Sequence, residues 1–179
     1  VVQSPKTLQH CMREVRFSIR ALMTQFRQLI ERLDLQIQKL IRELGWWEDY
    51  LRCLSMPGIG SANAAALVTT YHRGAFSGSD AFVAFLGLDI RLRESGRLKG
   101  KSKLSKQGHP ELRRLLYCAA KPAQSHPRFA DYHQKMIDSG RSKIAARVAL
   151  ARKLARIAFT LMNREEYFEV QGQAYCMAP

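Results

Sequence analysis

The stretch LQHCMREVRFSIRALMTQFRQLIERLDLQIQKLIREL, residues 8–44, determines the class of fold. Its apolar residues recur every three or four positions, and they are Leu8, Met12, Val15, Ile19, Leu22, Phe26, Leu29, Leu33, Ile37, Leu40 and Leu44. This spacing places one narrow apolar stripe on a long helix, with polar residues on the other faces. Pro5 suits the first turn of that helix, and Gly45 suits its end.

The narrow stripe predicts a partner helix. A helix of this length on so small a protein is expected to need a second helix, from another subunit or from a preceding part of the protein, to cover its apolar side. The alternative is a long helix that folds back on the rest of the chain. We therefore expect residues 1–50 to be a coiled-coil segment through which the protein forms a homo-oligomer.

The rest of the chain is also expected to be helical. One helix starts in the small-residue run at Ser61, and the others are predicted within 77–88, 109–123, 127–138 and about 142–163. No run of residues alternates as a strand does. The predicted fold is therefore all-α: a long N-terminal coiled-coil helix, a compact helical domain over 51–165 that contains a helix–hairpin–helix, and a tail over 166–179.

Composition narrows the classes of partner and compartment. The 179 residues, 46% of them hydrophobic, suffice for one modest core or a core with an arm, and the net charge of +14 indicates a polyanionic partner, nucleic acid first. The four cysteines form no CxxC pair and have no histidines at zinc-like spacing, so we expect reduced thiols. No apolar run is long enough to cross a bilayer, so a cytoplasmic protein without a membrane partner is predicted.

A glycine turn lies in CLSMPGIGSANAAALVTTY, residues 53–71. Gly58 and Gly60 would let backbone amides approach a ligand closely, and the start of the following helix adds partial positive charge. The stretch resembles a helix–hairpin–helix, a module that holds a DNA phosphate through backbone amides without reading bases. The alternative is an ordinary turn between packed helices.

The most basic stretch begins at RLRESGRLKGKSKLSKQG, residues 91–108. Residues 91–114 hold only two acidic residues against nine basic ones, which are Arg91, Arg93, Arg97, Lys99, Lys101, Lys103, Lys106, Arg113 and Arg114. Such density predicts a surface that binds the DNA backbone. Arginines beside a serine could also stabilise a phosphoryl group under attack. The residues alone do not choose between Ser95, Ser102 and Ser105, and three polar loop serines are the simpler interpretation.

A resemblance to a known family distinguishes between the three serines. The runs MPGIGSANAAAL (56–67), FVAFLGL (82–88) and RESGRLKGKSKLSKQGHPELRRLLYCAA (93–120) resemble the C-terminal transposase domain of the DEDD insertion-sequence transposases related to the pilin gene invertase. Some members of this family are guided by a bridge RNA. The match covers roughly 54–160 in order and spacing, and the family has a coiled-coil segment before this domain.

The resemblance implies a role for each serine that it aligns. The serine of the family's Ser-Gly pair is the recombination nucleophile, which corresponds to Ser95. The second serine position, here Ser105, can be threonine in relatives, which implies helix entry or a phosphate contact instead. One departure is Asp89, where the family usually has proline after the Gly-Leu pair.

The resemblance also implies a composite active site. In the family, an N-terminal RuvC-like domain binds Mg²⁺ through four acidic residues. Acids are sparse here, and the pair Glu165-Glu166 has no companion acids, so we expect no cofactor in this chain and Mg²⁺ in a missing N-terminal domain. The expected protein is a bacterial DNA transposase, associated with the nucleoid when acting, of which this chain alone is inactive. The alternatives are a non-catalytic helix–hairpin–helix module for DNA or RNA, and an assembly domain that oligomerises through residues 5–44.

Overall fold

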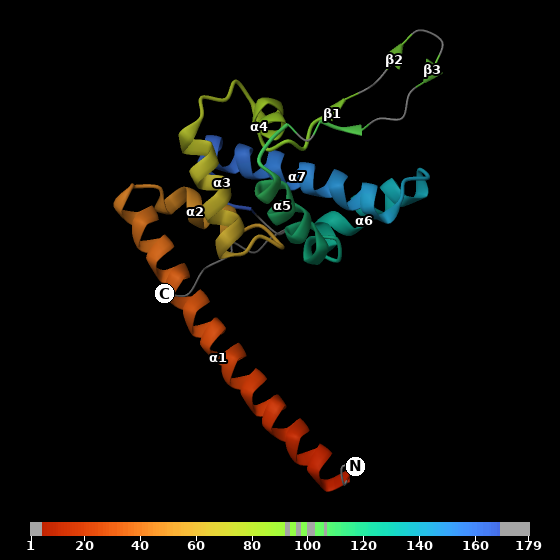
Figure 1. Cartoon of the computed structure of the whole chain (residues 1–179). Coiled ribbons are helices and arrows are strands. Elements are labelled where there is room, and N and C mark those ends of the chain that lie inside the picture. The colour runs from red at the N-terminus through yellow and green to blue at the C-terminus, as the bar shows by residue number, and fades with distance from the viewer. Residues whose placement is uncertain (1–4, 92–93, 96–97, 100–102, 106, 169–179) are drawn as a thin grey trace. The chain divides into compact units, whose positions relative to one another are not determined.

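The structure, a computed structural model, describes residues 5–91, 94–95, 98–99, 103–105 and 107–168. These residues form seven helices and four strands of two residues each (Figure 1). The helices are α1 (Pro5–Glu43), α2 (Trp47–Leu54), α3 (Ser61–Arg73), α4 (Ser79–Phe85), α5 (Pro110–Ala123), α6 (Pro127–Asp138) and α7 (Lys143–Arg164). The strands are β1 (Ile90–Arg91), β2 (Glu94–Ser95), β3 (Leu98–Lys99) and β4 (Lys103–Leu104). The all-α prediction is confirmed, and the short strands escaped it because two residues leave no alternating pattern.

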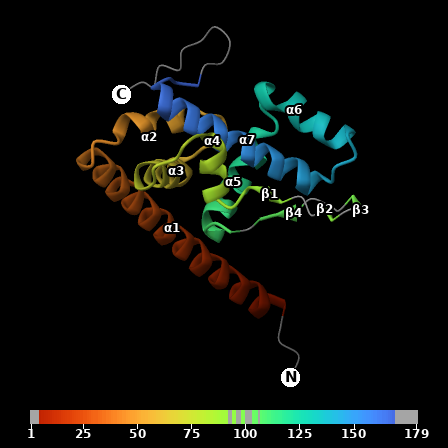
Figure 2. The same ribbon diagram turned by 90° about the horizontal axis from the view of Figure 1, so that it is seen from above.

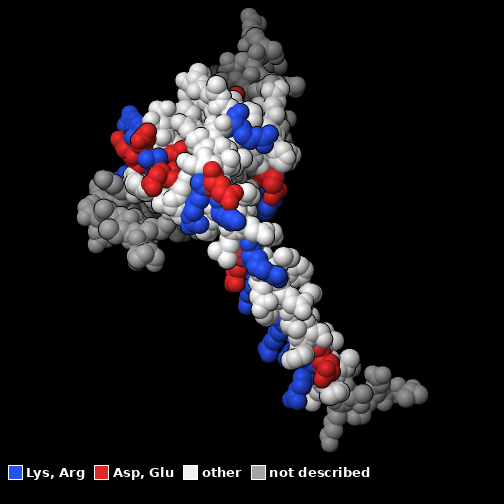
Figure 3. Space-filling view, turned by 90° about the vertical axis from the view of Figure 1, so that its left-hand side faces the viewer, with Lys and Arg blue, Asp and Glu red and all other residues white. Residues whose placement is uncertain are grey.

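The chain divides into two compact units, Val1–Leu40 and Ile41–Pro179. The first unit contains most of helix α1, which begins at Pro5 and ends before Gly45, as the sequence predicts. Most of its described apolar side chains are exposed, from Leu29 at 45% to Phe17 at 71%, whereas Ile37 is half-buried. Lys and Arg side chains lie along the same helix between uncharged ones (Figure 3). None of the helices that the structure describes is long and apolar enough to span a membrane.

The second unit is built around helix α7. Helices α2, α3, α4, α5 and α6 all contact α7 (Figure 2), and ten of its residues are buried. Five of the buried residues are alanines, which lets neighbouring helix backbones approach closely: Ala146, Ala149, Ala151, Ala155 and Ala158. Leu150 and Leu154 fill the space between them at 0% exposure. The core of this unit is therefore the surface of one helix covered on several sides.

The starts of the last three helices follow from short sequence signals. His109 precedes Pro110 and His126 precedes Pro127, and in each case the histidine Nδ1 accepts a 3.3 Å hydrogen bond from the backbone N–H two residues on. Ser142 caps α7, since its Oγ accepts from the Ala145 N–H at 3.2 Å. Side chains that satisfy these first N–H groups stabilise helix starts, and proline in the first helical position has no N–H to satisfy.

Candidate nucleic-acid interface and nucleophile

The basic stretch forms an antiparallel arm between helices α4 and α5. Ile90 pairs with Leu104 and Arg91 with Lys103, while further along Glu94 pairs with Lys99 and Ser95 with Leu98. Figure 1 shows β2 and β3 beyond β1 and β4, away from the helices. The backbone of Ser95 therefore lies near the end of the arm.

Asp89 begins the arm on its outgoing side. Its carbonyl oxygen accepts a 2.8 Å hydrogen bond from the Ser105 N–H, and its Oδ1 accepts one of 2.8 Å from the Ile90 N–H. Ser105 is half-buried. The carbonyl bond does not depend on the side chain at this position, whereas the Oδ1 bond is one that proline cannot make, so aspartate is compatible with the start of the arm.

The structure describes the predicted DNA-binding residues of the arm, and its serines, to different extents. Arg93, Arg97, Lys101, Ser102 and Lys106 lie outside the described residues. Only the backbone is described for a further set on the strands: Arg91, Ser95, Lys99 and Lys103. The strand pairing thus joins Arg91 to Lys103 and places Lys99 opposite Glu94, so basic residues occupy both sides of the arm.

Arg113 and Arg114 are neighbours on α5 with different surroundings. Arg114 is exposed and its Nε donates to both carboxylate oxygens of Glu111 at 2.9 Å. This hydrogen bond lowers the pKa of Glu111 from its ordinary value. Arg113 is half-buried, and its Nη1 donates to the carbonyl oxygen of Gly108. Arg114 therefore faces solvent as expected of a phosphate contact, whereas Arg113 is bonded to the backbone at the base of the arm.

The glycine turn joins α2 to α3, which pack against each other. The Tyr50 hydroxyl donates to Ser61 Oγ at 3.0 Å across the two helices. Gly58 has a φ of +86°, and a Cβ there would come within 2.9 Å of the Cβ of Ala123 on α5. Its lack of a side chain thus serves packing.

Gly60 is the glycine of the turn that has free space around it. It is exposed, a Cβ there would meet nothing within 4 Å, and it precedes α3 without a side-chain cap. Exposed N–H groups at the start of a helix favour anions. Of the two predicted glycines, Gly60 is therefore the one next to a surface that a phosphate can reach.

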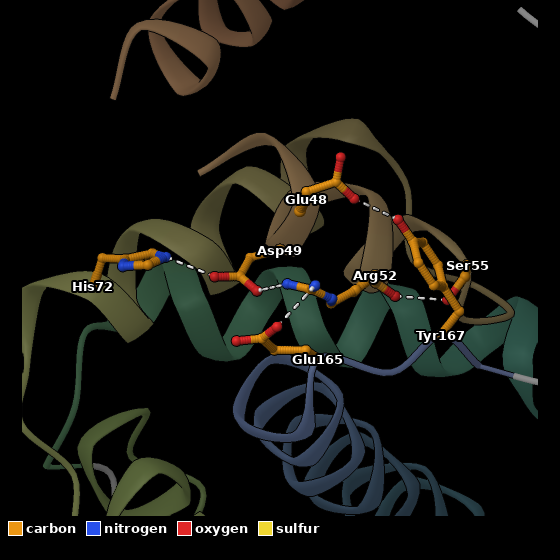
Figure 4. A network of polar contacts seen from close by, with 7 residues as sticks. All are labelled: Glu48, Asp49, Arg52, Ser55, His72, Glu165 and Tyr167. Atoms are coloured by element: carbon orange, nitrogen blue, oxygen red, sulfur yellow. Dashed lines mark hydrogen bonds and ion pairs between the residues drawn. The ribbon is translucent and has the colours of Figure 1, made fainter. Parts of the chain in front are cut away.

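A network of charged side chains ties the end of α7 back to α2 and α3 (Figure 4). Asp49 accepts from Arg52 at 2.7 Å and lies 2.8 Å from His72 Nε2. Glu165 Oε2 lies 3.9 Å from the same arginine. The ring of His72 also stacks on Trp46, with centroids 4.6 Å apart. Glu165 is thus brought by folding to the arginine that also binds Asp49, a contact that the sequence did not predict.

The network is completed by the segment that follows α7. The Tyr167 hydroxyl donates to Glu48 at 2.7 Å, which raises the pKa of the tyrosine. The N–H of Phe168, a buried residue, donates to Ser55 Oγ at 2.9 Å. These contacts hold residues 165–168 against α2. The sequence offered no signal for them, since the partners lie at opposite ends of the unit.

Metal-binding groups do not gather in the part of the chain that the structure describes. No three His, Cys, Asp or Glu side chains there are placed to hold an ion. The charged network itself contains an arginine between its acids, and a cation there repels a metal ion. The residues present thus do not fit the Mg²⁺ that the family resemblance implies.

Comparison with known proteins finds a family match in the region that contains the arm. Residues 51–134 match the family described as "Transposase IS116/IS110/IS902 family". The chain is also 32% identical over 157 residues to "Transposase for insertion sequence element IS1328" of Yersinia enterocolitica, an alignment that covers 82% of this chain and 47% of that protein. The chain thus spans about half the length of this relative. The family match runs from α2 into α6 and includes the glycine turn, the arm and the start of α5.

Proposed function

We propose that this chain, whose residues 51–134 match the family described as "Transposase IS116/IS110/IS902 family", is the DNA-binding and nucleophile-bearing part of a mobile-element transposase. The observation that carries the proposal is the arm. Its outer strands pair Ser95 with Leu98, away from the helices and within the most basic stretch of the chain. A hydroxyl near the end of a basic arm can reach a phosphodiester, and the surrounding cations attract the DNA backbone.

The proposed reaction is a transesterification at a DNA phosphate. Ser95 Oγ loses its proton and forms a bond to phosphorus, while one bond between phosphorus and a deoxyribose oxygen breaks. The released deoxyribose oxygen takes up a proton and becomes a hydroxyl. The phosphoserine keeps the phosphate at the ester level, so attack by the hydroxyl of another strand reverses the step and joins the new pair. Arginine and lysine side chains neutralise the phosphate oxygens during both attacks.

Two partners beyond DNA belong to the proposal. The first is a Mg²⁺-binding domain that acts on the other side of the phosphate, since the described residues of this chain have no site that fits the ion. The second is a guide RNA, as the resemblance implies for some members. This chain alone is accordingly expected not to cleave DNA, although it should bind duplexes through the arm.

Helix α1 supports a proposed homo-oligomer. Its apolar stripe is exposed from Met12 at 51% to Leu40 at 57%, except at Ile37, which is half-buried. Exposed apolar residues that keep a spacing of three and four along a helix are typical of coiled-coil seams. We infer that the stripe is covered by α1 of a second copy.

The experiment uses the full-length protein that contains this chain, with Mg²⁺ and a duplex that carries the element's ends. The element's RNA is added to one of two parallel reactions. We expect a covalent protein–DNA adduct that Ser95→Ala abolishes. DNA affinity should change by less than about twofold, because one hydroxyl contributes little beside so many charges. Ser102→Ala and Ser105→Ala are the matched controls, and each should keep most of the adduct.

Peptide mapping of the adduct decides the outcome. A phosphopeptide that contains Ser95 supports the proposal, whereas an adduct on Ser102 or Ser105 contradicts it. Strand exchange by Ser95→Ala at the wild-type rate contradicts it as well. Equal adduct yield with and without the RNA removes the guide RNA from the proposal.

A second candidate function is a helix–hairpin–helix module that binds DNA or structured RNA without chemistry. The open position of Gly60 at the start of α3 favours it, because the uncapped N–H groups there can bind one phosphate. In this case the full-length protein binds nucleic acid but forms no adduct under any of the conditions above.

A further inference from the structure

The arm needs a fixed base if its end is to deliver a side chain to one phosphate. Each of its two ladders pairs only two residues on each strand. A two-stranded hairpin of this size is marginally stable by itself. The direction of the arm must therefore be set where it leaves and rejoins the helices, between Gly87 and Gly108.

Gly87 ends helix α4 and turns the chain into the arm. Its φ is +70°, and its N–H donates to the Ala84 carbonyl at 2.9 Å while the Leu88 N–H donates to the Val83 carbonyl at 3.1 Å. This pair of bonds is the Schellman ending of a helix, which favours glycine at this residue. The outgoing strand thus starts from a fixed helix end.

Gly108 brings the returning strand into backbone contact with that helix end. A Cβ on Gly108 would lie 2.5 Å from the carbonyl carbon of Leu86 and in direct collision with the carbonyl oxygen of Phe85. A Cβ on Gly87 would lie 2.5 Å from the Gly108 nitrogen. The two chain segments therefore cross at a distance that only a pair of glycines allows.

Arg113 closes this crossing from helix α5. Its Nη1 donates to the Gly108 carbonyl, and the same nitrogen would lie 2.6 Å from a Cβ on Gly87. One guanidinium group thus lies against both glycines. The next contact outward is the 2.8 Å bond from Ser105 to Asp89, and β1 and β4 follow directly. Contacts among the described residues thus lead from the Arg113 side chain through the two glycines to the first pairs of the arm.

The geometry points to a clasp, made of Gly87, Gly108 and Arg113, that sets the direction of the arm and so positions Ser95. The inference rests on the proposed function, in which Ser95 is the nucleophile. It changes the role of Arg113, which the sequence placed among the phosphate contacts: Arg113 is a positioning residue, and its neighbour Arg114 remains available to DNA. Reactions that depend on orientation lose rate when a group is displaced by about 1 Å, by roughly 100-fold in well-studied cases.

The test compares two variants of the clasp with two matched controls in the full-length protein. Arg113→Gln and Gly108→Ala disturb the clasp. Arg114→Gln removes the same charge one residue further along α5, and Gly78→Ala adds the same methyl group where nothing lies within 4 Å. Amide hydrogen exchange of peptides covering 103–108 and 146–162 reports the base of the arm and the core separately.

We expect both clasp variants to speed exchange in 103–108 while exchange in 146–162 stays slow. At saturating duplex and Mg²⁺, adduct formation should slow by roughly 10- to 100-fold with little change in DNA affinity. Arg113→Lys keeps one donor and should restore part of the rate. Arg114→Gln should instead weaken DNA binding and leave exchange in 103–108 as in wild type. Gly78→Ala should change neither quantity.

Three results would overturn the inference. Unchanged exchange in 103–108 for Arg113→Gln means that there is no clasp. Faster exchange with a wild-type adduct rate means that the clasp does not position Ser95. A loss of DNA affinity in Arg113→Gln equal to that in Arg114→Gln makes Arg113 a phosphate contact. If wild type forms no Ser95 adduct, the proposed function fails, and the exchange data still decide whether the clasp exists.

Discussion

Helices α1 and α7 are the two longest helices of the chain, but their apolar residues have opposite surroundings. Helix α7 has ten buried residues. Among residues 9–43, where the side chains of α1 are described, helix α1 has one, Ile41 near its end. Both helices carry arginines along their length, so charge does not distinguish them. The residue sizes do: five of the ten buried residues of α7 are alanines, whereas the stripe of α1 consists of leucine, isoleucine, valine, methionine and phenylalanine.

This contrast indicates which sequence features distinguish a core helix from an interface helix. Small residues on several faces allow other helices to approach from several directions, as α2, α4, α5 and α6 do around α7. Large residues confined to one stripe leave room for contact along that stripe alone. The share of apolar residues in a helix cannot make this distinction, since it ignores both their size and their position.

The largest effect is expected from Leu154→Ala in α7. Leu154 is fully buried, so the change leaves a cavity in the core of the second unit and should lower its free energy of unfolding by about 2–5 kcal/mol. Urea titration followed by tryptophan fluorescence measures it, since Trp46 and Trp47 both lie in this unit. The control is Leu35→Ala on α1, 64% exposed, which should change the stability by less than about 0.5 kcal/mol. Equal losses would remove the contrast between the helices.

An intermediate effect is expected from Asp49→Asn in the charged network. The asparagine keeps one acceptor but loses the charge that binds Arg52 and His72, both of them poorly exposed, and should cost about 1–3 kcal/mol. Glu111→Gln breaks the exposed pair with Arg114 and serves as the control with no measurable loss. The same urea titration applies. An Asp49→Asn protein as stable as wild type would mean that the bonds from Tyr167 to Glu48 and from Phe168 to Ser55 hold residues 165–168 without the charge of Asp49.

The smallest effect on stability is expected from Leu22→Lys combined with Leu29→Lys on α1. The pair puts two charges into the exposed stripe, so sedimentation should give a smaller species while the urea midpoint of the second unit is unchanged. Thr24→Lys with Gln28→Lys adds the same charge outside the stripe and should leave the assembly intact. Wild type that is monomeric at all micromolar concentrations would contradict the proposed oligomer.

Local signals made the ends of several helices predictable, although helix α2 was not predicted. Pro110, Pro127 and Ser142 mark the starts of α5, α6 and α7, and Gly45 and Gly140 mark the ends of α1 and α6, because each acts within one turn of its own position. The same holds for the arm's charge, which is a property of consecutive residues. These features required no knowledge of the tertiary structure.

The role of Arg113 could not be predicted in this way. It depends on the crossing of Gly87 with Gly108, two segments separated by the whole arm, and the dipeptide Arg113-Arg114 gives no hint that one guanidinium turns inward. A glycine on each side of a basic stretch was the available signal, but a glycine in such a stretch is equally typical of a flexible loop. The network of Asp49, Arg52 and Glu165 escaped because its members, too, meet only in the folded chain.

The hydrogen bond between Tyr167 and Glu48 joins residues that are 119 positions apart in the chain, so the two ends of the second unit meet at helix α2. Together with the bond from Phe168 to Ser55, it makes the backbone of this unit a nearly closed ring. In a ring, the point at which the chain starts is a matter of connectivity and not of packing, so a linker from Phe168 to Ile41 with new ends opened between α6 and α7 keeps the described core residues of this unit. A circularly permuted chain should therefore pack in the same way, although its helices are synthesised in a different order.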